Sequence, residues 1–202
     1  PLGALDLQLR RQMQVELKRI QQHLGMTFIY ITHDQEEALN MSDRIVVMNE
    51  GNFEQMGTPE DIYERPQTLF AAEFIGSTNI IAATVKQADG QGGLLLDFAG
   101  GIIVAEDDTK KYMPGDEVVI SLRNERVRFA DQPEGGFELA GEIKEISYIG
   151  GTRKTVIGLD NGQDINVTGF RAERWMEYGE RVYLNWDAEH APIVSGGEED
   201  EE

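Results

Sequence analysis

The chain has 202 residues, 40% of them hydrophobic, which is enough for one large or two small domains with a buried core. It contains no cysteine, so disulfides and thiolate metal sites are excluded, and its three histidines show no metal-ligand spacing. The formal net charge of −19 argues against nucleic acid as a partner, because a phosphate-binding surface needs Lys and Arg.

From the start of the sequence to about Gly76, the pattern alternates between helices and strands. Apolar residues recur at steps of three and four from Leu9 to Leu24, which predicts a helix with one apolar face. Asp6 can cap the start of this helix and Gly25 can end it. Residues Met26–Thr32, MTFIYIT, are almost all apolar, aromatic or β-branched, which is typical of a parallel strand covered on both faces.

Shorter elements follow before Gly76. They are a helix at Gln35–Met41, a second buried strand at Arg44–Asn49 with a turn at Glu50–Asn52, a helix opened by the capping residues Thr58–Asp61, and a helix at about Thr68–Phe74. This order predicts α/β layering, but only about half a domain of it.

Beyond Gly76 the pattern changes to short strands separated by turns. The pair Asn161-Gly162, between TVIGLD and QDINV, predicts a tight hairpin. Strands are predicted at Ile80–Lys86, Leu94–Phe98, Ile102–Ala105, Glu117–Leu122, Arg126–Phe129, Gly141–Tyr148, Arg153–Leu159, Asp164–Thr168 and Arg181–Trp186. Many short strands at regular spacing predict a small barrel or a barrel-like sandwich.

His33 is the candidate functional residue of the first region. It follows the predicted strand Met26–Thr32, and Asp34 beside it is predicted to cap the next helix. Ligands of open α/β sheets bind at this edge, and an imidazole there can donate a hydrogen bond to a phosphate oxygen. The alternative is a histidine that only packs beneath the helix, and spacing alone leaves both interpretations open.

The first region resembles the C-terminal part of an ABC-transporter ATPase. The stretches that carry this resemblance are GALD (Gly3–Asp6), THDQEEAL (Thr32–Leu39), MSDRIVVMNEG (Met41–Gly51) and EQMGTPEDIYERP (Glu54–Pro66). The resemblance runs from Pro1 to about Asn79 and is greatest to the ATPases of spermidine/putrescine importers.

The later region resembles the regulatory domain called TOBE that is appended to such ATPases. Its LRPE stretch is similar to Val118–Phe129, with Asn124 in place of the usual proline. The expected fold class is therefore an α/β remnant of an ABC ATPase domain, residues 1–76, followed by an all-β, OB-like TOBE barrel, residues 77–195. Residues 196–202 are expected to form an acidic disordered tail.

The resemblance implies roles for two residues. His33 matches the switch histidine, which contacts the γ-phosphate of ATP and helps to hold the attacking water. Asp6 matches the acid of the D-loop, which lies across the ATPase dimer interface near the partner's nucleotide. A helix N-cap remains the alternative for Asp6, and the two roles are compatible. No metal ligand is assigned.

Other parts of such an ATPase site are missing from the sequence. There is no G-x-x-x-x-G-K-[ST] loop, no LSGGQ-type signature and no apolar strand that ends in Asp-Glu. In the family, PLGALD directly follows that Asp-Glu pair, so we expect a C-terminal fragment that binds no cofactor and is inactive alone. The intact parent would use ATP and Mg²⁺.

The resemblance also implies partners and a location for the parent. These are a homodimer of ATPase subunits, transmembrane permease subunits and a solute-binding protein, on the cytoplasmic, inner face of the cell membrane. Polyamine import is the implied transport function.

Two alternatives stay open for the barrel, which are a small-ligand module, for example for an oxyanion, and a dimerisation or regulatory module without catalysis of its own. From Gly76 onward the sequence has 12 Lys and Arg against 25 Asp and Glu. This balance disfavours an anion site unless a nest of backbone N–H groups provides one. A cation such as a polyamine would suit the acidity better, but other subunits normally select the substrate of such importers.

Overall fold

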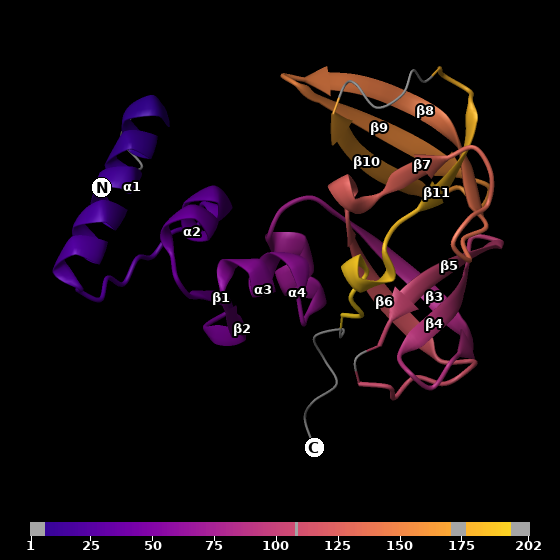
Figure 1. The fold of residues 1–202 in the computed structure, drawn as a ribbon, viewed down its shortest axis with the longest axis horizontal. Coiled ribbons are helices and arrows are strands. Elements are labelled where there is room, and N and C mark those ends of the chain that lie inside the picture. Colours follow the sequence, from indigo (N-terminus) through magenta and orange to yellow (C-terminus); the bar gives the residue numbers. More distant parts are fainter. Residues whose placement is uncertain (1–6, 108, 171–176, 195–202) are drawn as a thin grey trace.

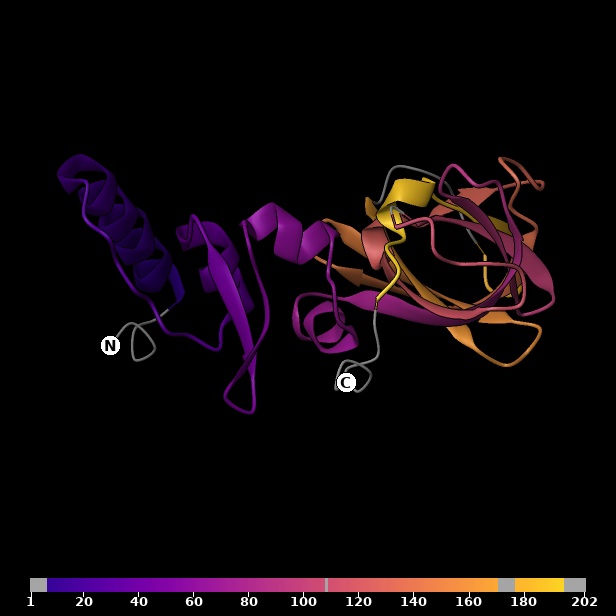
Figure 2. The ribbon, with the colours of Figure 1, turned by 90° about the horizontal axis from the view of Figure 1, so that it is seen from below.

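The computed structural model describes residues 7–107, 109–170 and 177–194. The predicted cap Asp6 and the predicted tail at residues 196–202 lie outside these ranges. Figures 1 and 2 show an elongated arrangement in which helices and a small hairpin lead into a larger body of β-sheets.

The elements before Gly76 begin with the long helix that the apolar periodicity predicts. This helix ends where Gly25 adopts a φ of +62°, a left-handed conformation that favours glycine. The elements are α1 (Leu7–Leu24), α2 (Gln35–Met41), β1 (Ile45–Asn49), β2 (Asn52–Gly57), α3 (Pro59–Glu64) and α4 (Leu69–Phe74). The predicted helices and the hairpin that turns at Glu50–Asn52 are therefore confirmed.

Local side-chain caps fix where the short helices begin. The Asp61 N–H donates to Thr58 Oγ1 at 3.2 Å, and the Thr58 N–H donates to the Asp61 carboxylate at 3.1 Å, which forms a capping box. At α4, the Ala71 N–H donates to Thr68 Oγ1 at 3.1 Å. Each cap satisfies N–H groups that the first helical turn leaves without a partner.

The prediction of a buried strand at Met26–Thr32 is wrong for this structure. The segment is irregular, and its Ile29 and Ile31 side chains are 90% and 94% exposed. A strand requires a neighbour for its backbone N–H and C=O groups, and none of the strands in the described part of the chain lies beside this segment. Apolar composition predicts where a strand can form, but pairing decides whether it does.

The strand predicted at Arg44–Asn49 is present but is buried on one face only. β1 pairs antiparallel with β2, and Ile45 and Val47 face a small core whereas Val46 and Met48 are exposed. This small core, which also contains residues of α3 and α4, is made of Ile45, Val47, Ile62, Ala71 and Ile75. The first region therefore has a hydrophobic centre separate from that of the sheets that follow.

The body after Gly76 consists of two antiparallel sheets. The four-stranded sheet has the order β5-β4-β3-β6, and the five-stranded sheet has the order β10-β9-β8-β11-β7. Their strands are β3 (Thr78–Ala88), β4 (Gly93–Phe98), β5 (Gly101–Glu106), β6 (Glu117–Arg123), β7 (Arg128–Ala130), β8 (Leu139–Ile149), β9 (Thr152–Leu159), β10 (Asp164–Phe170) and β11 (Arg181–Asn185). Figure 2 shows these sheets curving around a common interior.

One hydrophobic core fills this interior. Alternate residues along both sheets point into it, among them Leu96, Ile120, Ile157 and Leu184, which are fully buried. The predicted Asn161-Gly162 hairpin joins β9 to β10, and Gly162 adopts a φ of +87°. The predicted all-β, barrel-like body is therefore confirmed.

Several strand ends differ from their predictions by one or two residues, and one start differs in kind as well. Arg126 was expected to begin a strand, but Asn124–Arg126 forms a 3₁₀ turn, and β7 starts only at Arg128. The Asn124 side chain is buried and contacts Asn79, so this turn is part of the packing between β6, β3 and β10.

Among the described residues, no helix has the length and apolar character needed to cross a bilayer.

Candidate functional site

His33 lies between the irregular segment Met26–Thr32 and the first turn of α2. Its side chain is exposed and makes no hydrogen bond or ion pair with another described residue. Together with Asp34, Gln35 and Glu36 it lines a shallow hollow. The histidine is therefore not packed beneath the helix, and its ring nitrogens are free to contact another molecule.

The backbone around His33 is fixed by the start of α2. Asp34 is the N-cap, and its Oδ1 accepts a hydrogen bond from the Glu37 N–H at 3.2 Å. The Asp34 N–H in turn donates to Thr32 Oγ1 at 3.0 Å. Both neighbours of His33 are therefore held, which confirms the predicted cap at Asp34.

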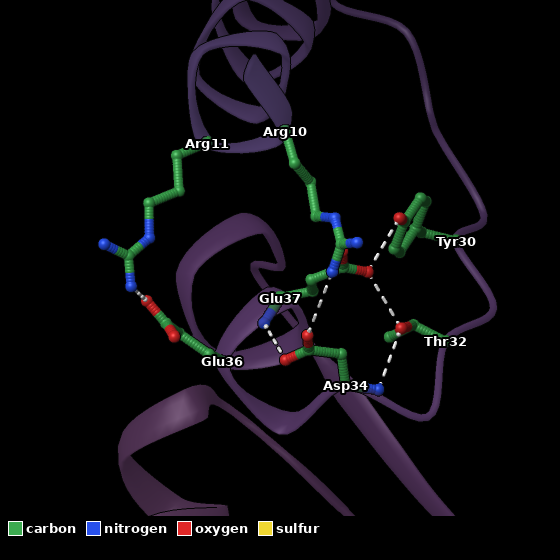
Figure 3. Close-up of polar contacts among 7 residues, drawn as sticks. All are labelled: Arg10, Arg11, Tyr30, Thr32, Asp34, Glu36 and Glu37. Atoms are coloured by element: carbon green, nitrogen blue, oxygen red, sulfur yellow. Dashed lines mark hydrogen bonds and ion pairs between the residues drawn. The ribbon is translucent and has the colours of Figure 1, made fainter. Parts of the chain in front are cut away.

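A buried carboxylate, Glu37, joins these contacts (Figure 3). Glu37 is only 6% exposed, and its Oε2 accepts hydrogen bonds from Tyr30 Oη and Thr32 Oγ1, both at 2.9 Å. Arg10 of α1 places its Nε 4.0 Å from Glu37 Oε1 and its Nη1 3.9 Å from Asp34 Oδ2. Burial, and then the hydrogen bond to Glu37, raise the pKa of Tyr30, which keeps this phenol a donor.

α1 is held against α2 by further contacts at exposed positions. Arg11 Nη2 lies 2.8 Å from Glu36 Oε1, and Lys18 Nζ donates to the Asn40 carbonyl at 2.8 Å. Figure 3 shows the Arg11–Glu36 pair beside the buried group around Glu37. Such exposed pairs contribute little free energy each, so they orient α1 more than they stabilise it.

The chemistry available at His33 is limited to hydrogen bonding and proton exchange. Its imidazole can donate to an anionic oxygen or accept a proton from a nearby group. Among the described residues, no group of three or more His, Asp or Glu side chains is arranged to hold a metal ion. These residues therefore do not fit a Mg²⁺ site by themselves, and neither does the sequence contain a phosphate-binding loop.

A second polar centre joins the helices to the sheet body at Arg123 of β6. This arginine is 3% exposed, and it donates from Nε and Nη2 to the Tyr63 carbonyl at 2.9 and 2.7 Å. Its Nη1 donates to the carbonyls of Ala72 at 3.1 Å and of Ile75. The guanidinium therefore binds carbonyls at the C-terminal ends of α3 and α4, where the helix dipole favours a cation.

Tyr63 adds to this junction through its ring and its hydroxyl. The Arg123 guanidinium lies 4.4 Å from the centre of the Tyr63 ring, within the range of a cation–π contact. The Tyr63 hydroxyl donates to Glu125. Burial, and then this hydrogen bond, raise the pKa of Tyr63 to about 12. Beside it, Arg126 pairs with Glu64 of α3.

Asn79 forms a third set of contacts at the same junction. Its Nδ2 donates to Asn124 Oδ1 at 3.0 Å and to the Asn166 carbonyl at 2.9 Å, and its Oδ1 accepts from the Asn166 N–H at 2.7 Å. This buried amide therefore connects β3, the 3₁₀ turn and β10. A proline in place of Asn124 would lack the side-chain oxygen that Asn79 uses.

A partly open cleft of about 390 Å³ lies at this junction, between the start of β3 and strands β9 and β10. Its wall is mostly polar and includes one acid and one base. The lining residues that offer hydrogen bonds or charge are Glu73, Ser77, Thr78, Asn124, Lys154, Thr155, Asn166 and Thr168. The cleft could accept a small polar ligand.

The predicted cap at Asp34 is confirmed, whereas His33 follows an irregular segment in place of the predicted strand, and the residues that hold the surrounding backbone were not predicted. Glu37, Tyr30 and Thr32 lie within the resembling stretch or next to it, but only the folded chain brings them together. Arg123 had a visible signal, since it is a charged residue at the end of an apolar strand. Asp6, the other predicted site residue, lies outside the described ranges.

Comparisons with known proteins find relatives that match both regions of the chain. A family model described as the TOBE domain matches residues 120–193. The curated "Spermidine/putrescine import ATP-binding protein PotA" of Thermobifida fusca is 41% identical over 201 residues, which cover 97% of this chain and 52% of that protein. The protein of the same name from Methylococcus capsulatus is 43% identical over 189 residues, 92% of this chain and 49% of that protein.

The chain therefore spans about half the length of the curated relatives it matches. Among solved structures, the cytoplasmic molybdate-binding protein ModG with molybdate bound is 17% identical, with a TM-score of 0.49. That likeness covers 57% of this chain and 94% of the ModG chain, and it is too weak to bear on fold or ligand.

Proposed function

We propose that this chain forms part of the ATP-hydrolysing subunit of an ABC importer of polyamines. It contains a TOBE domain and is similar to PotA proteins over nearly its whole length. In this proposal, residues 1–76 are the C-terminal portion of the nucleotide-binding domain and residues 77–195 are the regulatory TOBE domain. The observation that supports it most is identity of about 40% to import ATP-binding proteins over nearly the whole chain.

His33 is the proposed switch histidine of this subunit. Its exposed imidazole, without a partner among the described residues, is suited to donate to the γ-phosphate of ATP as charge develops there. Asp6 is the proposed D-loop acid near the nucleotide of a second subunit. The proposal also includes a homodimer of this subunit, permease subunits, a solute-binding protein and a location on the inner face of the membrane, as the family resemblance implies.

ATP and Mg²⁺ are proposed cofactors of the longer ATPase only. Phosphoryl transfer depends on a loop, a lysine and metal-binding acids that hold the triphosphate, and the present sequence supplies none of them. When bound, ATP would supply the electrophilic phosphorus, and Mg²⁺ would neutralise part of the charge on the phosphate oxygens. The contribution of this chain is to hold one donor, His33, in a fixed place.

The proposal is tested by His33→Ala in the longer ATPase that contains this chain. We expect turnover to fall by about 10²–10³, as for other lost donors to a transition state, with a much smaller change in ATP affinity. His23→Ala is the matched control, because His23 is also exposed but lies at the end of α1. Normal turnover in the His33 variant would refute the switch role.

A second candidate is that the sheet body binds a small ligand and acts as a binding or regulatory module. The polar cleft beside β9 and β10 favours it, since a ligand there would touch both α4 and the barrel. Calorimetric titration of the chain and of Lys154→Ala with a panel of small polar solutes would test this. If no solute in the panel gives a binding heat, the result would count against a binding module, and dimerisation would remain as the alternative role of the sheet body.

A further inference from the structure

The surroundings of His33 combine a free side chain with a tightly held backbone. The imidazole has no hydrogen-bond partner among the described residues. The residues on either side, Thr32 and Asp34, are by contrast joined to each other through the Asp34 N–H, which donates to Thr32 Oγ1 at 3.0 Å. The direction of the His33 Cα–Cβ bond is set by this short stretch of backbone.

All of these contacts lead to one buried carboxylate. Thr32 Oγ1, which accepts from Asp34, donates its own proton to Glu37 Oε2 at 2.9 Å. The Glu37 N–H closes the ring of contacts by donating to Asp34 Oδ1 at 3.2 Å. Glu37 therefore holds both neighbours of His33, one through its side chain and the other through its backbone (Figure 3).

Two more groups fix the carboxylate itself. Tyr30 Oη donates to the same oxygen at 2.9 Å, and Arg10 Nε lies 4.0 Å from the other oxygen. Burying a carboxylate is expensive, and well-packed apolar residues often stabilise a fold as well or better. A charge that is 6% exposed and contacts both α1 and the segment Met26–Thr32 is therefore better explained by a need for defined geometry than by stability alone.

We infer that Glu37 is the positioning residue of His33. It fixes the backbone of Thr32 and Asp34 and so sets the direction of the His33 Cα–Cβ bond. The inference rests on the proposed function, because direction matters only if His33 meets a phosphate. A displacement of about 1 Å at such a contact is enough to lower a rate by about 10²-fold.

The neighbouring acid provides a matched control. Glu36 lies on the same helix turn and pairs with Arg11 at 2.8 Å, but its side chain is 60% exposed and it contacts neither neighbour of His33. Glu36→Gln and Glu37→Gln remove the same charge from adjacent positions. A general effect of lost charge would be common to both variants, whereas a positioning effect is confined to Glu37.

The first experiment uses the 202-residue chain and does not depend on ATP. We expect Glu37→Gln to speed hydrogen exchange of the Asp34 amide by about tenfold or more, and to broaden or shift the His33 imidazole NMR signals. Amides of the sheet body should be unchanged, and Glu36→Gln should have neither effect. An unchanged Asp34 amide and imidazole in Glu37→Gln would overturn the inference.

Substitutions at Thr32 extend this test if Glu37→Gln disrupts the fold. Thr32→Val keeps the shape but removes the hydroxyl that links Glu37 to the Asp34 N–H, so it should reproduce the effects on exchange and on the imidazole signals. Thr32→Ser keeps the hydroxyl, so its Asp34 amide exchange and its His33 imidazole signals should match those of the unsubstituted chain. Equal behaviour of the valine and serine variants would show that packing, not this relay, holds His33.

The second experiment separates this inference from the proposed function. In the longer ATPase, Glu37→Gln should lower kcat at least about tenfold with a change in the KM for ATP below about twofold, and Glu36→Gln should change neither. If His33→Ala reduces turnover and Glu37→Gln does not, the positioning role is wrong. If the NMR effects occur but His33→Ala leaves turnover normal, the positioning role stands and the switch function fails.

Discussion

Replacing Arg123 with methionine should weaken the junction between the helices and the sheet body. Methionine keeps most of the aliphatic length but removes every donor that binds the carbonyls of Tyr63, Ala72 and Ile75. The bonds to Ala72 and Ile75 are buried, and an unsatisfied buried carbonyl costs about 1–3 kcal/mol. Burial lowers the pKa of Arg123, and relief of the same desolvation in the variant offsets part of this loss.

The net expectation is a loss of about 3 kcal/mol in the free energy of unfolding, from two buried carbonyls and a partial offset. With an m-value of about 2 kcal/mol per molar urea, this corresponds to a fall of about 1.5 M in the midpoint. Urea titration followed by far-UV circular dichroism measures it. Hydrogen exchange should place the loss at α4.

Arg128→Met is the control for this prediction. Arg128 also makes a bidentate contact, with Asp187 at 2.9 and 2.7 Å, but its side chain is 55% exposed. An exposed pair of this kind contributes about 0.2–1 kcal/mol, so its midpoint should move by less than about 0.5 M. Equal shifts in the two variants would refute the argument that burial of the acceptors makes Arg123 important.

Three more predictions concern the chain as a whole. The pKa of Tyr63 is about 12 in the folded chain and near 10.0 when unfolded, so the folded state binds more protons between these values and its stability falls as the pH rises. The urea midpoints at pH 9 and pH 11 should therefore differ less in Tyr63→Phe than in the unsubstituted chain. An equal difference in the two proteins would refute this. The 202-residue chain should neither hydrolyse ATP nor give a measurable heat on titration with it, and a micromolar affinity would contradict this. Because Ile29 and Ile31 are exposed on an unpaired segment, the chain should self-associate in sedimentation experiments, and replacing both with serine should reduce this more than replacing the exposed Met113 of the sheet body.

The parts of this fold that could be predicted are those fixed by neighbours in the sequence. The caps at Asp34 and Thr58 and the Asn161-Gly162 turn are set by residues within three positions, and the structure contains them all. The segment Met26–Thr32 could not be predicted in this way, because a strand depends on a partner elsewhere.

The same distinction applies to the candidate site. His33 was identified by its place after an apolar stretch and before a capped helix, which is local information. Glu37 stands four residues later, in the first turn of α2, but its burial depends on Tyr30 and on Arg10 of α1, and no spacing rule brings these together. Arg123 contacts carbonyls 48 to 60 residues earlier in the chain, so only the folded structure could identify them.

The two polar centres, at Glu37 and at Arg123, are joined by a short path through Gln35. Gln35 is the first residue of α2, two positions after His33, and its Oε1 accepts a hydrogen bond from the Gly76 N–H at 2.8 Å. Gly76 has a φ of +76°, and a Cβ there would lie 3.0 Å from the Tyr63 ring, so only glycine fits without strain.

This path has a physical consequence for coupling between the regions. One exposed hydrogen bond contributes little stability, but it fixes the distance between the first turn of α2 and the start of β3. Tyr63, which packs against Gly76, is itself held by Arg123 of β6. Gln35 therefore joins the first turn of α2, two residues after His33, to the segment that Tyr63 and Arg123 hold against the sheet body.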